Sequence, residues 1–167
     1  MPGDEGVWII IFGDMMVFGL FFATYLYYRS LNVNMYTAAQ SVLSKSYGLI
    51  NTLILLTSSW FVVWAIACFK NGNARESSRR LIAAIALGLA FWVIKILEYS
   101  EKIAAGHTLT KNEFFGFYYM FTGIHLVHVT VGIGALLYAV KKARNSTDIQ
   151  LETNTLVSIG VFWHMVD

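Results

Sequence analysis

Residues 114–140, FFGFYYMFTGIHLVHVTVGIGALLYAV, form a run of 27 residues without a single Lys, Arg, Asp or Glu. A transmembrane helix needs about 20 consecutive apolar residues, so this run predicts a helix that crosses a membrane. The run also holds two histidines, His125 and His128, three positions apart. They are either ligands for a metal or haem, or polar contacts inside a helical bundle.

The rest of the chain has the same character. Hydrophobic residues make up 57% of it and charged residues 13%, against roughly 25% charged in soluble domains. Residues 7–28, 48–69 and 81–99 form three further runs of spanning length, whereas residues 155–166 are too few to cross. We therefore expect an all-α, polytopic transmembrane helical bundle with four complete spans plus the start of a fifth, in a single membrane domain over residues 1–167.

The connections between the runs are short and polar, and they set the expected topology. The N-terminus, residues 70–80 and residues 141–154 carry seven Lys and Arg together, against four on the other side. The positive-inside rule therefore places the N-terminus in the cytoplasm. The start, MPGDEG, is acidic, unlike that of a signal peptide, so we expect it to be retained. A net charge of +2 is too small to suggest binding of nucleic acid.

His164 lies in the fifth run and Asp167 directly follows that run, three positions later on the same helical face. A carboxylate close to the middle of a membrane is costly, so we expect further residues to follow Asp167. The alternative is a short re-entrant end. Small residues in the longer runs, among them Gly88 and Gly132, indicate close approach of helices.

Asp14 lies about 10 Å into the first run, among Phe and Met side chains. Removal from water favours the uncharged form of a carboxyl group, so we expect Asp14 to be buried in the bundle and neutral at pH 7. Asp14 is then either a proton-exchanging or lipid-gating carboxyl, or a neutral acid that is hydrogen-bonded to another helix. Static polar contacts of the second kind are common in membrane bundles.

Glu98 lies three residues after Lys95 and four before Lys102, on one helical face, which predicts a local ion-pair cluster. A di-iron site in a bundle would instead take Glu-x-x-His from each of two helices. This chain offers Glu98-x-x-Glu101 and His-x-x-His, so we expect no metal site. Glu98 is predicted to face the helix of residues 114–140, with one of its two histidines within reach directly or through water or lipid.

The histidines leave several functions open. His125 and His128 are neighbours on one helix face, so they could not bind opposite sides of one haem iron, although His164 could complete a pair with either. A membrane haem or metal protein that uses these three histidines is therefore one alternative, and a small proton-coupled transporter that uses Asp14 and Glu98 is another. The third possibility is that the histidines form hydrogen bonds between helices or bind lipid headgroups, which does not require several of them to meet at one site.

Five motifs in order resemble subunit III of the haem-copper oxidase superfamily. They are IIIFGDMMVFGLFFATYLYYRS (9–30), INTLILLTSS (50–59), LGLAFWVIKILEY (87–99), TGIHLVHVTVG (122–132) and FWHMVD (162–167). The chain begins at the helix that bears the acid, as in the five-helix bacterial forms. MPGDEGVW (1–8), LLTSSWFV (55–62) and TKNEFFGFYYMFTGIHLVHV (110–129) are most similar to the NorE-type protein associated with nitric oxide reductase. Third subunits of bacterial quinol and cytochrome c oxidases are the alternative.

The resemblance implies a role in a complex. It implies an accessory subunit with no catalytic residue and no activity of its own, in a bacterial inner membrane. The oxidoreductase partner, a nitric oxide reductase or a terminal oxidase, would hold haem with copper or iron, and this chain would bind only phospholipid, in an interhelical cleft. Asp14 matches the family's intramembrane carboxyl. The residues expected to form a lipid-binding or structural polar cluster are Glu98, Tyr99, His125, His128, His164 and Asp167.

Overall fold

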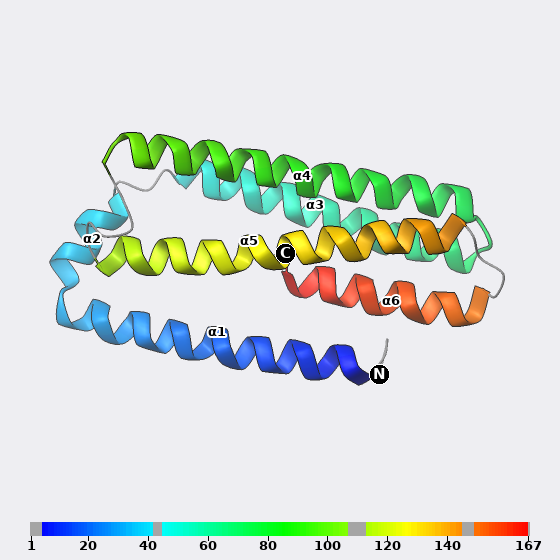
Figure 1. Cartoon of the computed structure of the whole chain (residues 1–167), viewed down its shortest axis with the longest axis horizontal. Helices are drawn as coiled ribbons and strands as arrows, with labels where there is room; N and C mark the ends of the chain where they lie inside the picture. Colours follow the sequence, from blue (N-terminus) through cyan, green and yellow to red (C-terminus); the bar gives the residue numbers. More distant parts are fainter. Residues whose placement is uncertain (1–4, 42–44, 107–112, 145–148, 167) are drawn as a thin grey trace.

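The structure, a computed structural model, describes residues 5–41, 45–106, 113–144 and 149–166. These residues form helices and their short connections, which run side by side along one axis (Figure 1). The helices are α1 (Glu5–Leu31), α2 (Val33–Ser41), α3 (Lys45–Lys70), α4 (Ala74–Ala104), α5 (Glu113–Arg144) and α6 (Ile149–Val166).

The four predicted spans are confirmed. Helices long and apolar enough to cross a membrane cover Gly6–Leu31, Ser46–Lys70, Ala74–Ala104 and Glu113–Arg144. Every backbone N–H and C=O in a helix interior is bonded within the helix, so a long apolar run has no other way to cross lipid. The fifth run lies in the shorter α6, which has 18 residues.

Several parts of the predicted connections are helical, and the start of α4 and the whole of α2 are the longest of them. α4 begins at Ala74, seven residues before the apolar run, and Glu76 supports this first turn through pairs with Arg79 at 3.6 Å and Arg80 at 2.7 Å. α3 and α4 are joined by the tight turn of residues 71–73, where Gly72 has a φ of 79°, a conformation that favours glycine.

The second such part is α2, in the connection between the first two spans. Its Tyr36 is fully buried and packs edge-on against Phe114 of α5, with ring centroids 5.8 Å apart. Burial raises the pKa of the Tyr36 hydroxyl above its ordinary value. α2 has nine residues, too few to cross a membrane, and an aromatic contact holds it at one end of the bundle.

The main core lies between α3, α4, α5 and α6. Small side chains let these helices approach closely, and the Ser58 hydroxyl donates a hydrogen bond to the Ala84 carbonyl across α3 and α4 at 2.9 Å. The fully buried Trp163 of α6 fills a space left by Gly88 and Gly132: a Cβ at Gly132 would lie 2.7 Å from the indole, and a Cβ at Gly88 would lie 3.1 Å from it.

α1 packs differently. It lies along the edge of the bundle, next to α5 and α6 (Figure 1). Of the α1 side chains that the structure describes, only Ile11 is buried. The inner face of α1 therefore meets the core through the tips of long side chains, and space remains between them.

Candidate functional site

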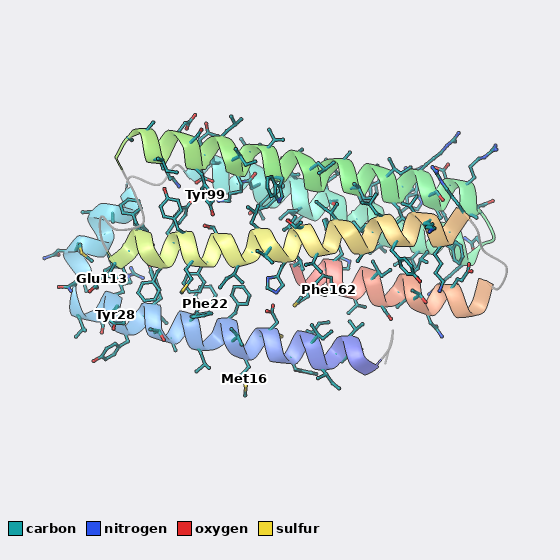
Figure 2. The ribbon with its side chains drawn as sticks, in the orientation of Figure 1. Met16, Phe22, Tyr28, Tyr99, Glu113 and Phe162 are labelled. Atoms are coloured by element: carbon teal, nitrogen blue, oxygen red, sulfur yellow. The ribbon has the colours of Figure 1, made fainter. Side chains whose placement is uncertain are left out.

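An aromatic contact holds α1 to α5 over the half of α1 that leads to α2. Phe121 of α5 lies against four α1 rings, with centroid distances of 6.5 Å to Phe18, 6.0 Å to Phe21, 4.9 Å to Phe22 and 6.4 Å to Tyr25. Figure 2 shows such side chains filling the space between the two ribbons. Large rings at this position keep the backbones of α1 and α5 apart.

Asp14 and His128 meet one turn further along the same pair of helices. The Oδ1 atom of Asp14 lies 3.1 Å from Nε2 of His128, and the side chains are 21% and 26% exposed. The expectation that Asp14 is buried in the bundle is therefore wrong. α1 lies at the edge of the bundle, so the carboxyl group is half-buried, and it has a polar partner on α5.

The second ring nitrogen of His128 limits how the pair can share its protons. Nδ1 lies 2.8 Å from the carbonyl oxygen of Ile124, and a carbonyl can only accept, so Nδ1 carries a proton. Two arrangements then satisfy Nε2: a protonated Asp14 donates to a neutral imidazole, or an imidazolium donates to a carboxylate. In both arrangements the pair shares one further proton and has no net charge.

The Asp14–His128 pair lines a cavity of about 230 Å³. The other lining residues are Met15, Phe18, His125, Met165 and Val166. A second cavity, of about 400 Å³, lies between the same three helices and is lined by Val7, Ile10, Val131, Ala135, Tyr138, Thr155, Ser158, Ile159 and Phe162. Ile10 and Val131 lie about one turn from Asp14 and His128, so the two cavities follow each other along the helices.

His125 and His164 make other contacts. The His125 ring packs edge-on against Phe91 of α4 at 5.5 Å, and Nδ1 of His164 lies 2.6 Å from the Ser59 hydroxyl of α3. Among the residues that the structure describes, no three His, Cys, Asp or Glu side chains are placed to hold a metal ion. The three histidines are thus distributed over different contacts.

Glu98 forms the predicted ion-pair cluster. Its carboxylate lies 2.5 Å from Nζ of Lys102 and 2.8 Å from Nζ of Lys95, and it accepts a hydrogen bond from the Tyr118 hydroxyl at 2.8 Å. Glu98 therefore faces α5, as predicted, but it meets Tyr118 there. Glu98 and Lys102 are both buried, and all three charged groups belong to α4, so the link from this cluster to α5 is the hydrogen bonding of the Tyr118 hydroxyl.

The remaining site residues lie close to this cluster or outside the described part. Tyr99 donates a hydrogen bond to the Thr122 hydroxyl of α5. Glu101 accepts a hydrogen bond from Tyr47 of α3 at 3.1 Å instead of joining Glu98. Asp167 lies outside the described residues. The expected polar cluster is thus divided into a Glu98 group, an Asp14–His128 group with His125 beside it, and His164 with Ser59.

Several partners in these groups were not predicted. Tyr118 and Phe121 belong to a run of aromatic residues that pointed to no single contact, and Ser59 belongs to a Thr-Ser-Ser stretch inside an apolar span. A polar residue inside a span needs a partner, and this is the signal that could have singled out Ser59.

Comparison with known proteins places the chain in a family. The model of the family "Cytochrome c oxidase subunit III" matches residues 4–167. Cytochrome c oxidase subunit 3 of Bacillus sp. (strain PS3) is 27% identical over 163 residues, 97% of this chain and 78% of that protein. Cytochrome bo(3) ubiquinol oxidase subunit 3 of Buchnera aphidicola subsp. Acyrthosiphon pisum is 26% identical over 165 residues, again 97% and 78%.

A third relative is the heme-copper oxidase subunit I+III of Aeropyrum pernix, 26% identical over 175 residues, which are 99% of this chain and 22% of that protein. The family match extends over almost the whole chain, including the helix of Asp14 and the helix of the two histidines. With its four spanning helices, the chain belongs to the cytochrome c oxidase subunit III family.

Proposed function

We propose that this chain is a non-catalytic accessory subunit of a haem-copper respiratory complex, where it stabilises the catalytic subunit and holds phospholipid between its helices. The family match over residues 4–167 carries the proposal. The Aeropyrum pernix relative, named subunit I+III, supports a catalytic subunit I as the partner. In this proposal the haem and the copper or iron belong to that partner.

The partner is proposed to be a nitric oxide reductase. The support is the resemblance of residues 1–8, 55–62 and 110–129 to the NorE-type protein. The relatives above are named as cytochrome c and ubiquinol oxidases, so a terminal oxidase that reduces oxygen is the alternative. Both partners would be located in a bacterial inner membrane, with the N-terminus of this chain in the cytoplasm according to the distribution of Lys and Arg.

The two cavities between α1, α5 and α6 support the proposed lipid site. The larger is lined mostly by apolar side chains such as Ile10 and Phe162, which suit an acyl chain. The smaller adds the polar groups of Asp14, His125 and His128. A lipid tail there would occupy space that the side-chain tips of α1 leave unfilled.

Purification from native membranes tests the proposed partner. The complex isolated through a tag on this chain is expected to contain a haem-copper catalytic subunit, which mass spectrometry identifies, and its turnover with nitric oxide or oxygen separates the two alternatives. The chain isolated without its partner is expected to lack a visible haem spectrum. A stoichiometric haem or metal in the isolated chain would contradict the accessory role.

A double variant, His125→Gln with His128→Gln, tests the role of the cavity. Glutamine retains hydrogen-bonding capacity but lacks the coordination and titration of imidazole. Turnover of the partner is expected to persist, while less phospholipid is retained or less subunit is assembled. A variant that assembled normally but abolished turnover would place the histidines in electron or proton transfer and would refute the proposal.

A further inference from the structure

The smaller of the two cavities beside α1, with the Asp14–His128 pair in its wall, lies deep in the spans. α5 has 32 residues from Glu113 to Arg144, and His128 is the sixteenth of them, so at least about 22 Å of helix lies on either side. The hydrocarbon core of a membrane is about 30 Å thick. The pair therefore lies near the middle of the membrane, and a ligand of this cavity has to be soluble there.

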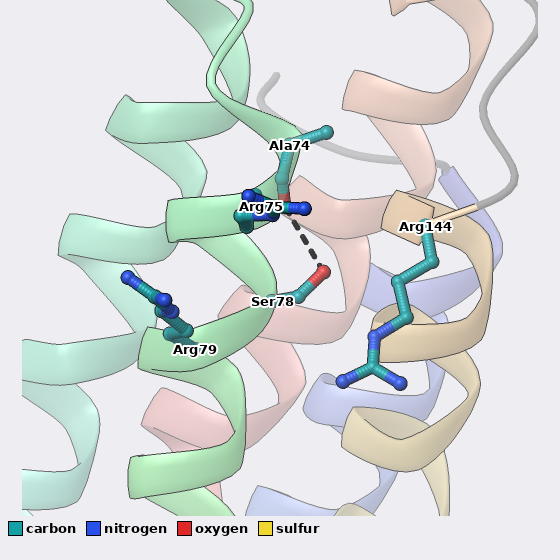
Figure 3. Close-up of a pocket in the computed structure, with 5 residues that line it drawn as sticks. All are labelled: Ala74, Arg75, Ser78, Arg79 and Arg144. Atoms are coloured by element: carbon teal, nitrogen blue, oxygen red, sulfur yellow. Dashed lines mark hydrogen bonds between the residues drawn. The ribbon is translucent and has the colours of Figure 1, made fainter.

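The wall of this cavity carries no cation. Basic side chains line a different pocket, of about 550 Å³, at the end of the bundle, formed by Ala74, Arg75, Ser78, Arg79 and Arg144 (Figure 3). The described residues around the smaller cavity include no Lys or Arg, and Asp14 and His128 together have no net charge. A charged headgroup this deep in a membrane would be costly without a partner, so the cavity suits an uncharged polar head.

The Asp14–His128 pair offers such a head an acceptor. Both protons of the pair are in use, because Nδ1–H of His128 donates to the Ile124 carbonyl and the second proton lies between Nε2 and Oδ1 of Asp14. The Oδ2 atom of Asp14 takes no part in that contact. In either protonation arrangement the pair can therefore accept a hydrogen bond from a ligand hydroxyl but has no proton to donate to a ligand carbonyl.

His125 provides a second polar group in the same wall. Its ring packs edge-on against Phe91 at 5.5 Å, and within the described part of the chain it forms no hydrogen bond. A neutral imidazole has one donor and one acceptor nitrogen. Residues three apart on a helix have Cβ atoms about 5–6 Å apart, so a ring with oxygens on opposite sides could reach both His125 and the Asp14–His128 pair.

The apolar part of the wall suits a flat ring. Phe18 lies edge-on to His128, with centroids 5.9 Å apart, and Met15 and Met165 also line the cavity. Aromatic rings pack well edge-on, and methionine sulfur makes favourable contacts with ring edges. The volume of about 230 Å³ is below the roughly 300–1,000 Å³ of sites for drug-sized ligands, which indicates a head of one ring.

The larger cavity has room for a hydrocarbon tail. It measures about 400 Å³ and follows the smaller one along the helices, with Ile10 about one turn from Asp14 and Val131 about one turn from His128. Its wall is mostly apolar. A ligand with a small polar ring and a long hydrocarbon tail would occupy both cavities at once.

We propose that these cavities bind a membrane quinol, with its ring between Asp14 and His125 and its isoprenoid tail in the larger cavity. One hydroxyl donates to Oδ2 of Asp14 and the opposite hydroxyl bonds to His125. The oxidised quinone lacks both protons and loses the bond to Asp14, so the site prefers the reduced form. This assignment rests on the proposed function, which places a membrane lipid between α1, α5 and α6, and it names the class of lipid whose head lies in the smaller cavity.

Photoaffinity labelling tests the site, with the full chain in phosphatidylcholine vesicles and a diazirine-bearing ubiquinol analogue as the probe. Mass spectrometry locates the labelled residues under anaerobic conditions, and decylubiquinol, decylubiquinone and phosphatidylglycerol serve as separate competitors. The test variant combines Asp14→Leu with His125→Leu. The control is His164→Leu, which removes an imidazole that bonds to Ser59 and does not line the cavity. Circular dichroism checks that both variants keep their helix content.

Label is expected on the residues of α1 and α5 that line the cavities, and decylubiquinol should compete at lower concentrations than decylubiquinone. Each hydrogen bond inside a membrane is worth about threefold in binding, so the concentration of decylubiquinol for half competition should rise roughly tenfold in the test variant. The His164→Leu control should leave it unchanged.

Three results would overturn the assignment. Label spread equally over lipid-facing residues such as Leu56 and Val93 would show that the probe only dissolves in the bilayer. Equal competition by decylubiquinone would refute the acceptor role of Asp14. Competition by phosphatidylglycerol as strong as by decylubiquinol would assign the cavities to phospholipid and leave the proposed function intact, because the purification that identifies the partner subunit gives its answer independently.

Discussion

α4 and α1 are both long, apolar, membrane-spanning helices, yet they pack in opposite ways. α4 buries Ala84 and Gly88 against its neighbours, whereas α1 leaves nearly all of its described side chains at least partly exposed. α1 has glycines as well, but a Cβ at Gly13 or Gly19 would meet nothing within 4 Å. Lipid provides no hydrophobic drive for helix association, so close packing requires small residues that face a complementary surface.

The comparison explains why the titratable groups differ in setting. Glu98 lies inside the close-packed part. Its carboxylate forms ion pairs with two lysines and accepts a hydrogen bond from a tyrosine. Asp14 lies on the loosely packed helix, where one histidine and a cavity adjoin it. In the first setting the Tyr118 hydroxyl links the α4 cluster to α5, and the second setting leaves room for a ligand beside α1.

The largest effect is expected when the buried charge cluster is broken. Glu98→Gln leaves Lys95 and Lys102 without their carboxylate, and removal of one partner of a buried ion pair costs about 3–5 kcal/mol. The free energy of unfolding, measured by steric trapping in bicelles, is expected to fall by this amount. Glu101→Gln is the control, because this exposed residue bonds to Tyr47; an equal loss in both variants would contradict the role of the cluster.

A smaller loss is expected from crowding the tryptophan contact. Gly132→Leu would place a Cβ 2.7 Å from the indole of Trp163, and overpacking of this kind costs about 1–3 kcal/mol. Gly134→Leu, two residues along the same helix, is the control: a Cβ at Gly134 meets nothing within 4 Å, so this variant should be close to silent in the same measurement. If both variants had the same stability, the close packing of α5 on α6 would not depend on this glycine.

The attachment of α1 is expected to be weaker still. Phe121→Ala removes the ring that meets four α1 aromatics, and aromatic pairs are worth about 0.5–1.5 kcal/mol. Spin labels at Leu20→Cys on α1 and Leu89→Cys on α4, with Cys68→Ser, should give a broader distance distribution in the variant.

Phe12→Ala is the control for that experiment, since Phe12 is 62% exposed and its ring contact is to Trp8 of its own helix. It should leave the distribution unchanged. An unbroadened distribution in Phe121→Ala as well would mean that α1 is held by other contacts, and that the difference between α1 and α4 is smaller than the burial of their side chains indicates.

Features that lie within one helix could be predicted from the sequence. The four spans follow from the length of apolar runs, and the Lys95–Glu98–Lys102 cluster follows from spacings of three and four residues. Both depend on local geometry. The start of α4 at Ala74 and the whole of α2 were not predicted. The spans were predicted from the length of apolar runs, and these polar or mixed segments contain no such run.

Contacts between helices could be predicted only in part. The two histidines share a helix face, yet His128 meets Asp14 of α1 and His125 packs on Phe91 of α4. These partners depend on how α1 and α4 are placed around α5, which three-residue spacing does not determine. Glu98 facing α5 was predicted, but its contact there is Tyr118, which nothing in the sequence singles out from the neighbouring aromatics.

The smallest expected effect concerns the proton shared by Asp14 and His128. If the carboxyl group is neutral and donates to Nε2, then Asp14→Asn preserves the bond, because the amide N–H₂ donates in the same place. If the pair is a carboxylate and an imidazolium, Asp14→Asn removes the charge pair. The low polarity of the membrane favours the neutral form, so we predict almost no change in unfolding free energy for Asp14→Asn. For Asp14→Leu, which cannot donate, we predict a loss of about 0.6 kcal/mol, the average for polar bonds between membrane helices.

A hydrophobic carbodiimide, which reacts with protonated carboxyl groups, should accordingly label Asp14 in native membranes. If labelling failed and Asp14→Asn destabilised α1 as much as Asp14→Leu, the ionised pair would be correct and α1 would be tied to α5 by charge, unlike α4, whose ion pairs lie within its own helix.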